Sequence, residues 1–436
     1  MELSKLFQSV PLRAPSVLPD CDISRVEYDS RRAGAGALFC CLVGAKTDGH
    51  RYAANAYAQG CRAFLVSRPV DLPADAAQML VDDTRIAMAT VCENFYGNPV
   101  RKLRLIGITG TKGKTTTSLL IAAILNGAGK KCGYIGSNGV QIDGQPFALD
   151  RTTPTTPESR ELAVCFDAMV RAGCSHCVME VSSQALKTYR VAGLSFRSVL
   201  YTNLSPDHIG EGEPPDFADY LACKRRLFTD YPTENIIANT DDPYAAEVAG
   251  EKVISCSVQN PATDFYADNI HPYRDAHTLG VSFDCRAAGT KTAVRLRSPG
   301  DFSVMNGLLA LAVCALEGVT VPAAAETLAG VSPEGRFEIV QGLPDRTFII
   351  DYAHNGVSLT SALNVLRAYK PRRLICLFGT VGGRTQNRRR ELAEAAALAD
   401  FCILTTDNPD FEPPEQFIDE IARYMTVPYT KITDRE

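Results

Sequence analysis

The stretch GITGTKGKTTT, from Gly107 to Thr117, decides the fold of this 436-residue chain. It follows an apolar run, Leu103–Ile108, that predicts a buried strand, and it precedes Ser118–Leu125, an apolar-faced stretch that predicts a helix. A strand, a glycine-rich turn and a helix together bind phosphate, because backbone N–H groups and the helix N-terminus point at one place.

Two side chains at this loop predict a site for a nucleotide with a bound metal ion. Lys114 is placed to reach the outer phosphates, and the Thr115 hydroxyl is placed to face a bound Mg²⁺. The general P-loop has a further glycine where this chain has Ile108, so the pattern present is the shorter Gly110-x-x-Gly113-Lys114-Thr115. The alternative is an ordinary glycine-rich turn, and the Lys-Thr pair argues against it. The loop predicts a nucleotide site without indicating the reaction.

Composition limits the class of protein. A length of 436 residues predicts roughly three domains. The net charge of -5 comes without a long basic run, so we expect no nucleic-acid partner. No apolar stretch approaches the roughly 20 residues of a membrane span, and the N-terminus lacks the apolar core of a signal peptide. Most of the 15 cysteines lie in apolar runs, which predicts reduced core residues of a cytoplasmic protein.

Apolar runs that end in polar residues recur after the loop, at Cys177–Val181, Val199–Asn203 and Ile236–Asn239, with helical patterns between them. Alternating strands and helices favour a mainly parallel sheet with helices on both faces. Ligands of such sheets bind at the carboxyl ends of the strands, so the polar residues that close each run are the candidate site.

Two breaks divide the chain. Pro99 with the charged Arg101–Arg104 marks one linker, and Val331–Gly335 marks a second. The first part mixes short apolar runs with helical stretches, and beyond the second break the alternating pattern restarts with strands at Thr347–Asp351, Leu374–Phe378 and Phe401–Thr405 and a helix at Arg388–Ala399. Residues 250–298 predict a β-rich insert. The predicted domains are residues 1–98, 99–332 and 333–436.

Three strand-end or helical residues are candidates to complete the site. Glu180 closes the run Cys-Val-Met-Glu, where a carboxylate suits Mg²⁺, a cation that prefers oxygen ligands. His208 follows another strand, although a lone histidine is more often structural. Lys224, considered by itself, is an ordinary helix lysine.

The ordered motifs GTKGKTTT, MEVSSQAL, TNLSPDH, the helix with Lys224, GRFE (335–338), DYAH (351–354) and DNP (407–409) resemble those of the Mur ligases, and DSRRAGAGALFCCLVGAKTDGH (29–50) resembles the UDP-binding domain of the MurE type. The resemblance covers essentially the whole chain. It implies three α/β domains: one for the UDP end of the substrate, a central P-loop ATPase-like domain with a parallel sheet, and a Rossmann-like C-terminal domain.

The resemblance also implies roles for individual residues. The residues expected near UDP or the muramoyl-peptide are Ser30, Arg31, His50, Thr155, Thr156, Ser183 and Arg190. The residues expected to bind ATP are Gly110, Thr111, Lys112, Gly113, Lys114, Thr115, Thr116, Asn306, Arg336, Asp351 and His354. The Mg²⁺ shell implied is Thr115, Glu180, His208 and Lys224, the last as a carbamate, and the catalytic set implied is Lys114, Lys224, His208 and Glu180.

The chemistry implied by the family is an ATP-dependent ligation. ATP converts the D-glutamate γ-carboxylate of UDP-N-acetylmuramoyl-L-Ala-D-Glu into an acyl phosphate, which the amine of a free amino acid attacks. The protein contributes positioning and charge neutralisation, with Mg²⁺ and Lys114 offsetting negative charge. A monomer that closes its domains around ATP and substrate is expected.

The chain departs from the family pattern at three places. Lys112 stands where asparagine is usual, and Gly383 and Thr385 replace two acidic residues, so only Arg384 is carried over there. The segment Asp407-Asn408-Pro-Asp410 has aspartate where diaminopimelate-adding enzymes have an arginine that binds the distal carboxylate. An aspartate attracts an ammonium instead, so the residues predict L-lysine or a similar diamino acid, with meso-diaminopimelate as the alternative.

The relatives also continue beyond this sequence with a helix and a strand carrying Gly-Lys-Gly-His-Glu, so a shortened C-terminal domain is expected. Three rival interpretations remain. One is folylpolyglutamate synthase, but that enzyme lacks a UDP domain like residues 29–50. The others are a nucleotide switch, which the absence of an Asn-Lys-x-Asp motif argues against, and a non-catalytic paralogue that binds the precursor.

Overall fold

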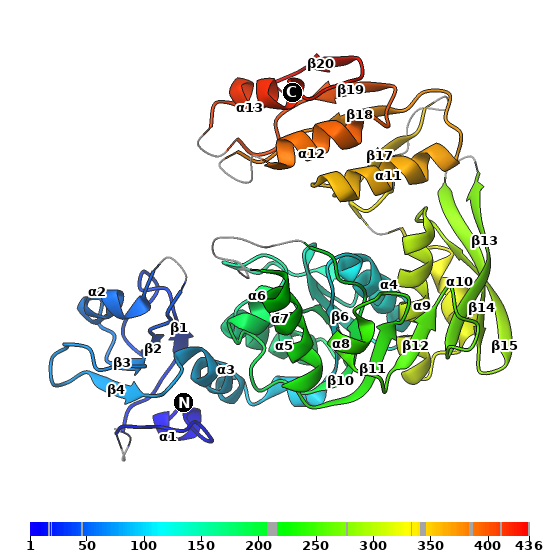
Figure 1. The fold of residues 1–436 in the computed structure, drawn as a ribbon. Coiled ribbons are helices and arrows are strands. Elements are labelled where there is room, and N and C mark those ends of the chain that lie inside the picture. The colour runs from blue at the N-terminus through cyan, green and yellow to red at the C-terminus, as the bar shows by residue number, and fades with distance from the viewer. Residues whose placement is uncertain are drawn as a thin grey trace. The chain divides into compact units, whose positions relative to one another are not determined.

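The computed structural model describes residues 1–15, 18, 20–44, 47–206, 216–275, 278–332, 334–340, 346–382, 387–409 and 412–434. The chain divides into two compact units (Figure 1). The first comprises Met1–Asp268, Asp284–Ala293 and Met305–Leu328, and the second comprises Asn269–Phe283, Val294–Val304 and Ala329–Glu436. The predicted boundaries at residues 98 and 332 stay a prediction.

The N-terminal part of the first unit is a four-stranded parallel sheet in the order β1-β2-β3-β4. Its strands alternate between two cores: Leu38 and Leu65 pack with helix α3, while Phe39 and Phe64 pack with α2. A period of two residues explains this division, because successive side chains point to opposite faces. The elements are α1 (Leu3–Leu6), β1 (Arg25–Glu27), β2 (Ala37–Cys40), η1 (Gly49–Tyr52), α2 (Ala53–Ala58), β3 (Ala63–Val66), β4 (Ala77–Leu80), α3 (Thr84–Phe95) and η2 (Pro99–Lys102).

The central sheet has the strand order β15-β14-β13-β12-β11-β10-β5-β9-β6-β7-β8. The six strands from β12 to β6 pair in parallel, and β7 and β8 are antiparallel. Its elements are β5 (Arg104–Thr109), α4 (Lys114–Gly127), β6 (Cys132–Gly136), β7 (Gly139–Ile142), β8 (Gln145–Pro146), α5 (Ser159–Arg171), β9 (His176–Glu180), α6 (Ser183–Lys187), β10 (Phe196–Tyr201), α7 (Phe217–Thr229), β11 (Thr233–Asn239), α8 (Ala245–Ala249), β12 (Ile254–Ser257), β13 (Phe265–Arg274), β14 (Leu279–Ala287), β15 (Thr290–Leu296), α9 (Asp301–Leu316) and α10 (Val321–Leu328).

Apolar side chains on the parallel strands and their helices form the core of this sheet. Helix α5 contributes Phe166 and Met169, which pack with Leu105 of β5 and Met179 of β9. Helix α4 packs against β6 and β9. Strands β12 to β15 form the β-rich insert that the sequence predicted at 250–298. The predicted parallel α/β fold of the central region is therefore confirmed.

The C-terminal part of the second unit has a three-stranded parallel sheet in the order β18-β19-β20, with α11, α12 and α13 sharing its core, and a separate antiparallel pair, β16 and β17. The predicted strand at Thr347–Asp351 is thus present as β17 but belongs to the antiparallel pair. The elements are β16 (Glu338–Val340), β17 (Phe348–Ile350), α11 (Gly356–Ala368), β18 (Ile375–Phe378), α12 (Asn387–Ala396), β19 (Phe401–Leu404), α13 (Pro414–Ala422) and β20 (Tyr429–Lys431).

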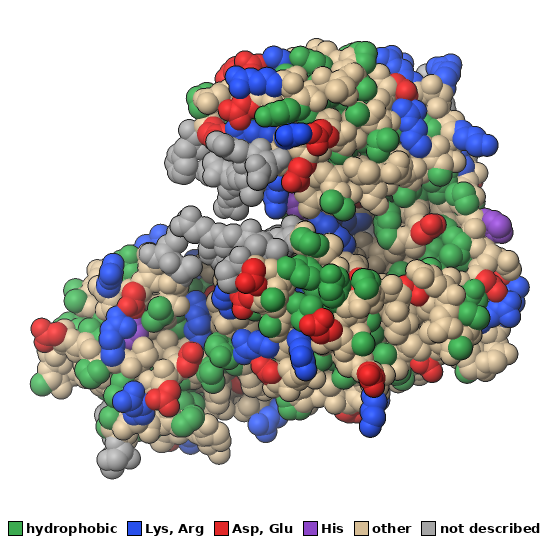
Figure 2. Space-filling model, in the orientation of Figure 1, with side chains coloured by type: hydrophobic (Ala, Val, Ile, Leu, Met, Phe, Trp, Pro, Cys, Tyr) green, Lys and Arg blue, Asp and Glu red, His purple; other side chains and the backbone are tan. Residues whose placement is uncertain are grey.

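All 15 cysteines are free thiols, and 14 of them are buried, in agreement with the prediction of reduced core residues. On the face drawn in Figure 2, basic and acidic side chains are interspersed rather than gathered by sign. Among the described helices, none has both the length and the apolar character needed to cross a membrane.

Candidate active site

The predicted phosphate loop connects β5 to α4 at the carboxyl edge of the central sheet. Strand β5 ends at Thr109 and helix α4 begins at Lys114, so residues 110–113 form the turn. Gly113 precedes the helix with φ +83, and a Cβ there would collide with the Asn306 side chain. Only glycine accepts this combination of backbone and close neighbour. Asn306 also accepts a hydrogen bond from the Thr117 hydroxyl at 3.3 Å, so this predicted ATP contact does lie at the loop.

Two lysines converge on this loop. The Lys114 ammonium donates to the carbonyls of Gly110 at 2.8 Å and Thr111 at 3.0 Å. The Lys224 ammonium, on α7 and only 1% exposed, donates to the same Gly110 carbonyl at 2.9 Å and lies 4.5 Å from the centroid of the Tyr220 ring. The fold thus places two cationic side chains at the N-terminus of α4, where the helix dipole also favours an anion.

The end of β10 holds the loop backbone in place. The Thr202 hydroxyl and the Asn203 side-chain amide both donate to the Lys112 carbonyl, at 2.6 and 3.1 Å. The Lys112 N–H donates to the Asn203 side-chain oxygen at 3.0 Å, and the Thr111 N–H donates to the Asn203 carbonyl at 2.8 Å. Thr202 and Asn203 belong to the TNLSPDH motif, but their role as loop anchors was not predicted. Their position after a strand was the available signal.

Glu180 ends β9 beside the loop, and its side chain is fully buried. One carboxylate oxygen, Oε1, accepts from the Tyr134 hydroxyl at 2.8 Å and from the Ser137 N–H at 2.9 Å. The other, Oε2, accepts from the Ser137 hydroxyl at 3.3 Å. Within the described ranges no lysine, arginine or histidine nitrogen forms an ion pair with this carboxylate. A buried charge without a counter-ion is expensive, so the carboxylate suits a bound cation.

The rest of the predicted metal shell is less complete. Thr115 lies in the first turn of α4 and is buried. His208 lies outside the described residues. Over the residues that are described, no three His, Cys, Asp or Glu side chains form a group able to hold a metal ion.

The predicted contacts to the muramoyl-peptide gather next to Glu180. Thr156 donates its hydroxyl to the Glu180 carbonyl at 2.9 Å and accepts from the Ser182 N–H at 3.0 Å. Arg190 donates to the Thr156 carbonyl at 3.1 Å. The Thr155 hydroxyl lies 2.9 Å from that of Ser137. The buried Ser183 begins α6.

A buried carboxylate, missed from the sequence, holds Arg190. Glu158 pairs with Arg190 at 3.2 Å and with Arg85 of α3 at 2.8 Å, and all three side chains are at least four-fifths buried. Burial lowers the pKa of Arg190, and the charge of Glu158 counteracts that shift. Glu158 therefore fixes the guanidinium that holds the Thr156 backbone.

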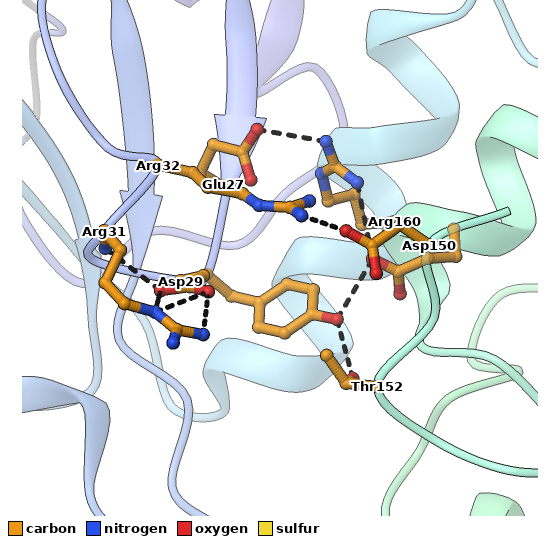
Figure 3. A network of polar contacts seen from close by, with 9 residues as sticks. Glu27, Asp29, Arg31, Arg32, Asp150, Thr152 and Arg160 are labelled. Carbon is orange, nitrogen blue, oxygen red and sulfur yellow. Dashed lines mark hydrogen bonds and ion pairs between the residues drawn. The ribbon is translucent and has the colours of Figure 1, made fainter.

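A second network joins the end of β1 to the same region of the central sheet (Figure 3). Arg160 of α5 pairs with Glu27 at 3.0 Å, and Arg32 pairs with Asp150. The Tyr28 hydroxyl lies 2.9 Å from that of Thr152. These contacts connect the candidate UDP region with the segment that precedes Thr155 and Thr156.

The predicted UDP contacts themselves are spread over this N-terminal sheet. Arg31 folds back on Asp29, to which its Nη2 donates at 2.6 Å (Figure 3). His50 is buried; its Nε2 accepts from the Ser67 N–H at 3.0 Å, which assigns the proton to Nδ1, 2.7 Å from Asp48. Ser30 lies between Asp29 and Arg31 in the sequence and is half-buried.

The remaining candidates lie in the second unit. Arg336 stacks over the Tyr352 ring at 4.5 Å, the His354 Nδ1 lies 2.9 Å from the Tyr352 carbonyl, and Asp351 accepts from the N–H groups of Phe337 and Ala353. Arg336, Asp351 and His354 therefore lie close together, and their role in binding ATP stays a prediction.

The segment of residues 407–410, which we call the amino-acid selector because it is expected to contact the incoming amino acid, is only partly described. The Gly382 N–H donates to the Asn408 carbonyl at 2.8 Å, so the turn after β18 contacts the segment containing Asp407 and Asn408. Arg384 and Asp410 lie outside the described residues.

Three successive parts of the chain match known protein families. Residues 22–96 match the family described as "Mur ligase family, catalytic domain", residues 108–314 match the "Mur ligase middle domain", and residues 335–436 match the "Mur ligase, glutamate ligase domain".

Individual relatives extend this match over nearly the full length. The UDP-N-acetylmuramoyl-L-alanyl-D-glutamate-2,6-diaminopimelate ligase of Clostridium botulinum is 36% identical over 92% of this chain and 82% of its own. The enzyme of the same name from Caldanaerobacter subterraneus is 37% identical over 96% of this chain and 86% of its own. A solved structure with that name superposes with a TM-score of 0.72 at 26% identity, covering 100% of this chain and 89% of the other.

Together, these matches and the loop geometry confirm the predicted family and its three-domain α/β fold. The chain belongs to the Mur ligase family, the ATP-dependent ligases that form amide bonds, and within that family it is of the MurE type.

Proposed function

We propose that the chain joins meso-diaminopimelate to the D-glutamate γ-carboxylate of UDP-N-acetylmuramoyl-L-Ala-D-Glu, in the synthesis of peptidoglycan precursors. The observation that carries this proposal is the loop before α4, where Lys114 and Lys224 share one carbonyl and the buried Glu180 lies at the adjacent strand end. The names of the relatives supply the substrate pair.

The choice of amino acid departs from the charge argument that favoured L-lysine. The relatives are named for 2,6-diaminopimelate, and Asp410, on which that argument depended, lies outside the described residues. An aspartate in the amino-acid selector is also compatible with diaminopimelate, because the distal carbon of diaminopimelate carries an ammonium as well as a carboxylate. L-lysine therefore becomes the alternative that the assay tests.

The proposed reaction has two steps. A γ-carboxylate oxygen of the precursor bonds to the terminal phosphorus of ATP, which releases ADP and leaves an acyl phosphate. The neutral amine of diaminopimelate then bonds to the acyl carbon, loses a proton and expels inorganic phosphate. The backbone amides of Gly113 and of the first turn of α4, together with the Lys114 ammonium, are proposed to bind and orient the phosphates, and their positive charge opposes the repulsion between carboxylate and phosphate.

Mg²⁺ fits the residues present. Glu180 offers a buried carboxylate without an ion pair in the described chain, and Thr115 offers a hydroxyl at the start of α4. Mg²⁺ would neutralise phosphate charge when bound. His208 is proposed to complete the shell.

Lys224 is proposed to carry a carbamate, formed when its neutral amine adds to CO₂ and loses a proton. The change turns a buried cation into an anion, which suits a position beside a metal. Incubation with ¹³C-bicarbonate should give a carbamate carbon signal in the wild type that Lys224→Ala lacks. A Lys224→Ala variant that keeps the full rate at low bicarbonate contradicts this proposal.

The other site assignments form part of the same proposal. Residues proposed at the UDP-sugar end are Ser30, Arg31 and His50, and those proposed at the peptide are Thr155, Thr156, Ser183 and Arg190. Residues proposed to bind ATP from the C-terminal part and from α9 are Asn306, Arg336, Asp351 and His354, and those proposed for the amino acid are Arg384, Asp407, Asn408 and Asp410.

The test is ADP release coupled to a spectrophotometric assay, with UDP-N-acetylmuramoyl-dipeptide and either meso-diaminopimelate or L-lysine. We expect release that requires both substrates and favours meso-diaminopimelate. Lys114→Ala should lower the rate by at least about 100-fold, the range seen when one donor to a transition-state charge is lost. Lys102→Ala, which removes an exposed lysine, is the control. A Lys114→Ala variant as active as this control refutes the assignment, and a preference for L-lysine restores the charge argument.

A further inference from the structure

Two residues, one on β6 and one just after it, hydrogen-bond to the Glu180 carboxylate. Strand β6 pairs in parallel with β9, the strand that Glu180 ends. Tyr134 and Ser137 together make three hydrogen bonds to it, at 2.8, 2.9 and 3.3 Å. The Tyr134 ring is fully buried, so its hydroxyl has no access to water. Neither residue is part of the phosphate loop, and the proposed reaction has so far used neither.

The direction of the tyrosine hydrogen bond is set by its neighbours. The Asn138 N–H donates to the Tyr134 oxygen at 3.3 Å, so that oxygen serves as an acceptor there. Its single proton then goes to Glu180 Oε1, because a carboxylate only accepts. Gly136 makes this approach possible: a Cβ at that position would collide with both Glu180 Oε1 and the Tyr134 hydroxyl.

The two carboxylate oxygens are consequently unequal. Oε1 accepts two bonds shorter than 3.0 Å, while Oε2 accepts one longer bond. Oε2 therefore retains the greater capacity for a further ligand. Hydrogen bonds from outer residues orient the carboxylates that bind metals and fix which oxygen faces the ion.

We propose that Tyr134 is a positioning residue: its hydroxyl holds Oε1 of Glu180 and so turns Oε2 toward the divalent cation of the nucleotide site. This inference rests on the proposed role of Glu180 in binding Mg²⁺. The Ser137 hydroxyl lies between Glu180 Oε2 and the Thr155 hydroxyl, at 3.3 and 2.9 Å. The positioned carboxylate is thus linked to the segment proposed to bind the muramoyl-peptide.

The experiment compares Tyr134→Phe with Tyr201→Phe in the full-length protein. Tyr201 is a matched control, because it is equally buried in the same sheet and donates its hydroxyl to a carboxylate, Asp242, at 2.7 Å. Mn²⁺ replaces Mg²⁺ as the probe, and electron paramagnetic resonance measures the free ion in the presence of protein and ADP. Thermal unfolding of each variant reports whether the two substitutions disturb the fold equally.

We expect Tyr134→Phe to weaken Mn²⁺ binding about tenfold, the effect usual for losing an outer hydrogen bond to a metal ligand, while Tyr201→Phe stays within about twofold of wild type. The Mg²⁺ concentration for half-maximal ADP release should rise by a similar factor, and the rate at saturating Mg²⁺ should recover. Equal Mn²⁺ affinity in both variants overturns the proposal, as does a wild type that binds no Mn²⁺ with ADP.

A second variant provides an independent measurement if Tyr134→Phe does not fold. Gly136→Ala keeps the hydroxyl but places a methyl group against Glu180 Oε1, so it should weaken Mn²⁺ binding in the same way. Unchanged Mn²⁺ affinity in Gly136→Ala contradicts the positioning role. The proposed function fails separately: a wild type that binds Mn²⁺ in a Tyr134-dependent manner, yet releases no ADP with precursor and amino acid, keeps the positioning role and loses the ligase substrates.

Discussion

Glu317 should be a main source of stability at the end of the central sheet opposite the nucleotide loop. It follows α9 directly, and its carboxylate is fully buried. Oε2 accepts from Arg104 at 2.7 Å and lies 3.2 Å from His176 Nε2, while Oε1 accepts from Arg197 at 3.4 Å. A carboxylate at a helix C-terminus opposes the helix dipole, so these partners are what make the position favourable.

The magnitude follows from the pKa of this carboxyl group. Burial by itself would raise the pKa, but the hydrogen bonds from His176 and Arg104 lower it from 4.5 to about 2. At about 1.4 kcal/mol for each pKa unit, this corresponds to about 3 kcal/mol of stability. Because Arg104 is 55% exposed and its charge is screened by solvent, we expect about 2 kcal/mol. A lowered pKa means that the contribution is complete above pH 4.5 and is lost as the pH falls toward 2.

Urea unfolding followed by far-UV circular dichroism tests this expectation with Glu317→Gln. At pH 7.5 the free energy of unfolding should fall by about 2 kcal/mol, and at pH 3 the difference from wild type should shrink by about half. Glu247→Gln, on the exposed side of α8, is the control for removing a surface charge. The ligase rate of folded protein should not change, since the six residues of β5 place Arg104 roughly 17 Å from the loop. A Glu317→Gln variant as stable as the control, or equally weakened at both pH values, refutes the reasoning.

Three further substitutions give expected outcomes. Gly113→Ala should reduce ADP affinity at least about tenfold in calorimetric titration and lower stability by about 1–3 kcal/mol, because its Cβ meets Asn306 at a positive φ. Glu158→Gln should raise the KM for the UDP-precursor about tenfold in steady-state assays with a smaller change in kcat, since it removes the ion-pair partner of Arg190. Burial raises the pKa of Glu93 from 4.5 to about 7, so its contribution to stability is complete below pH 4.5 and is lost as the pH rises through 7. Glu93→Gln should therefore exceed wild type by about 2–3 kcal/mol in urea unfolding at pH 8, and the two should converge below pH 5.

The elements around the nucleotide loop were predictable because their signals are local. Leu103–Ile108 was expected as a strand, and β5 covers Arg104–Thr109. The following helix was expected from Ser118 but begins at Lys114. Its first turn consists of Lys-Thr-Thr-Thr, which has no apolar period, so the hydrophobic pattern alone placed the start one turn late. The turn at Gly113 sets the true beginning.

The partners of the site residues were not predictable, because they come from distant parts of the chain. Tyr134 and Glu180 are 46 residues apart, and Arg104 and Glu317 are 213 residues apart. No spacing or period marks such pairs; the parallel register of β6 and β9 brings the first pair together. The sequence thus proposes which side chains contact ligands, whereas the fold shows which other side chains hold them in place.

Lys112, which replaces the asparagine usual in the family, shows how the sequence pattern and the fold together determine the loop. A lysine in place of the usual asparagine suggested an altered loop, yet Thr202 and Asn203 contact only the backbone N–H and carbonyl of this residue among the hydrogen bonds that define the turn. Those backbone groups are the same whatever side chain position 112 carries. The conformation of the turn is therefore determined by the end of β10 and by Gly113. We therefore expect the substitution to add positive charge beside the proposed phosphate site while the backbone of the turn, held by Thr202 and Asn203, keeps its shape.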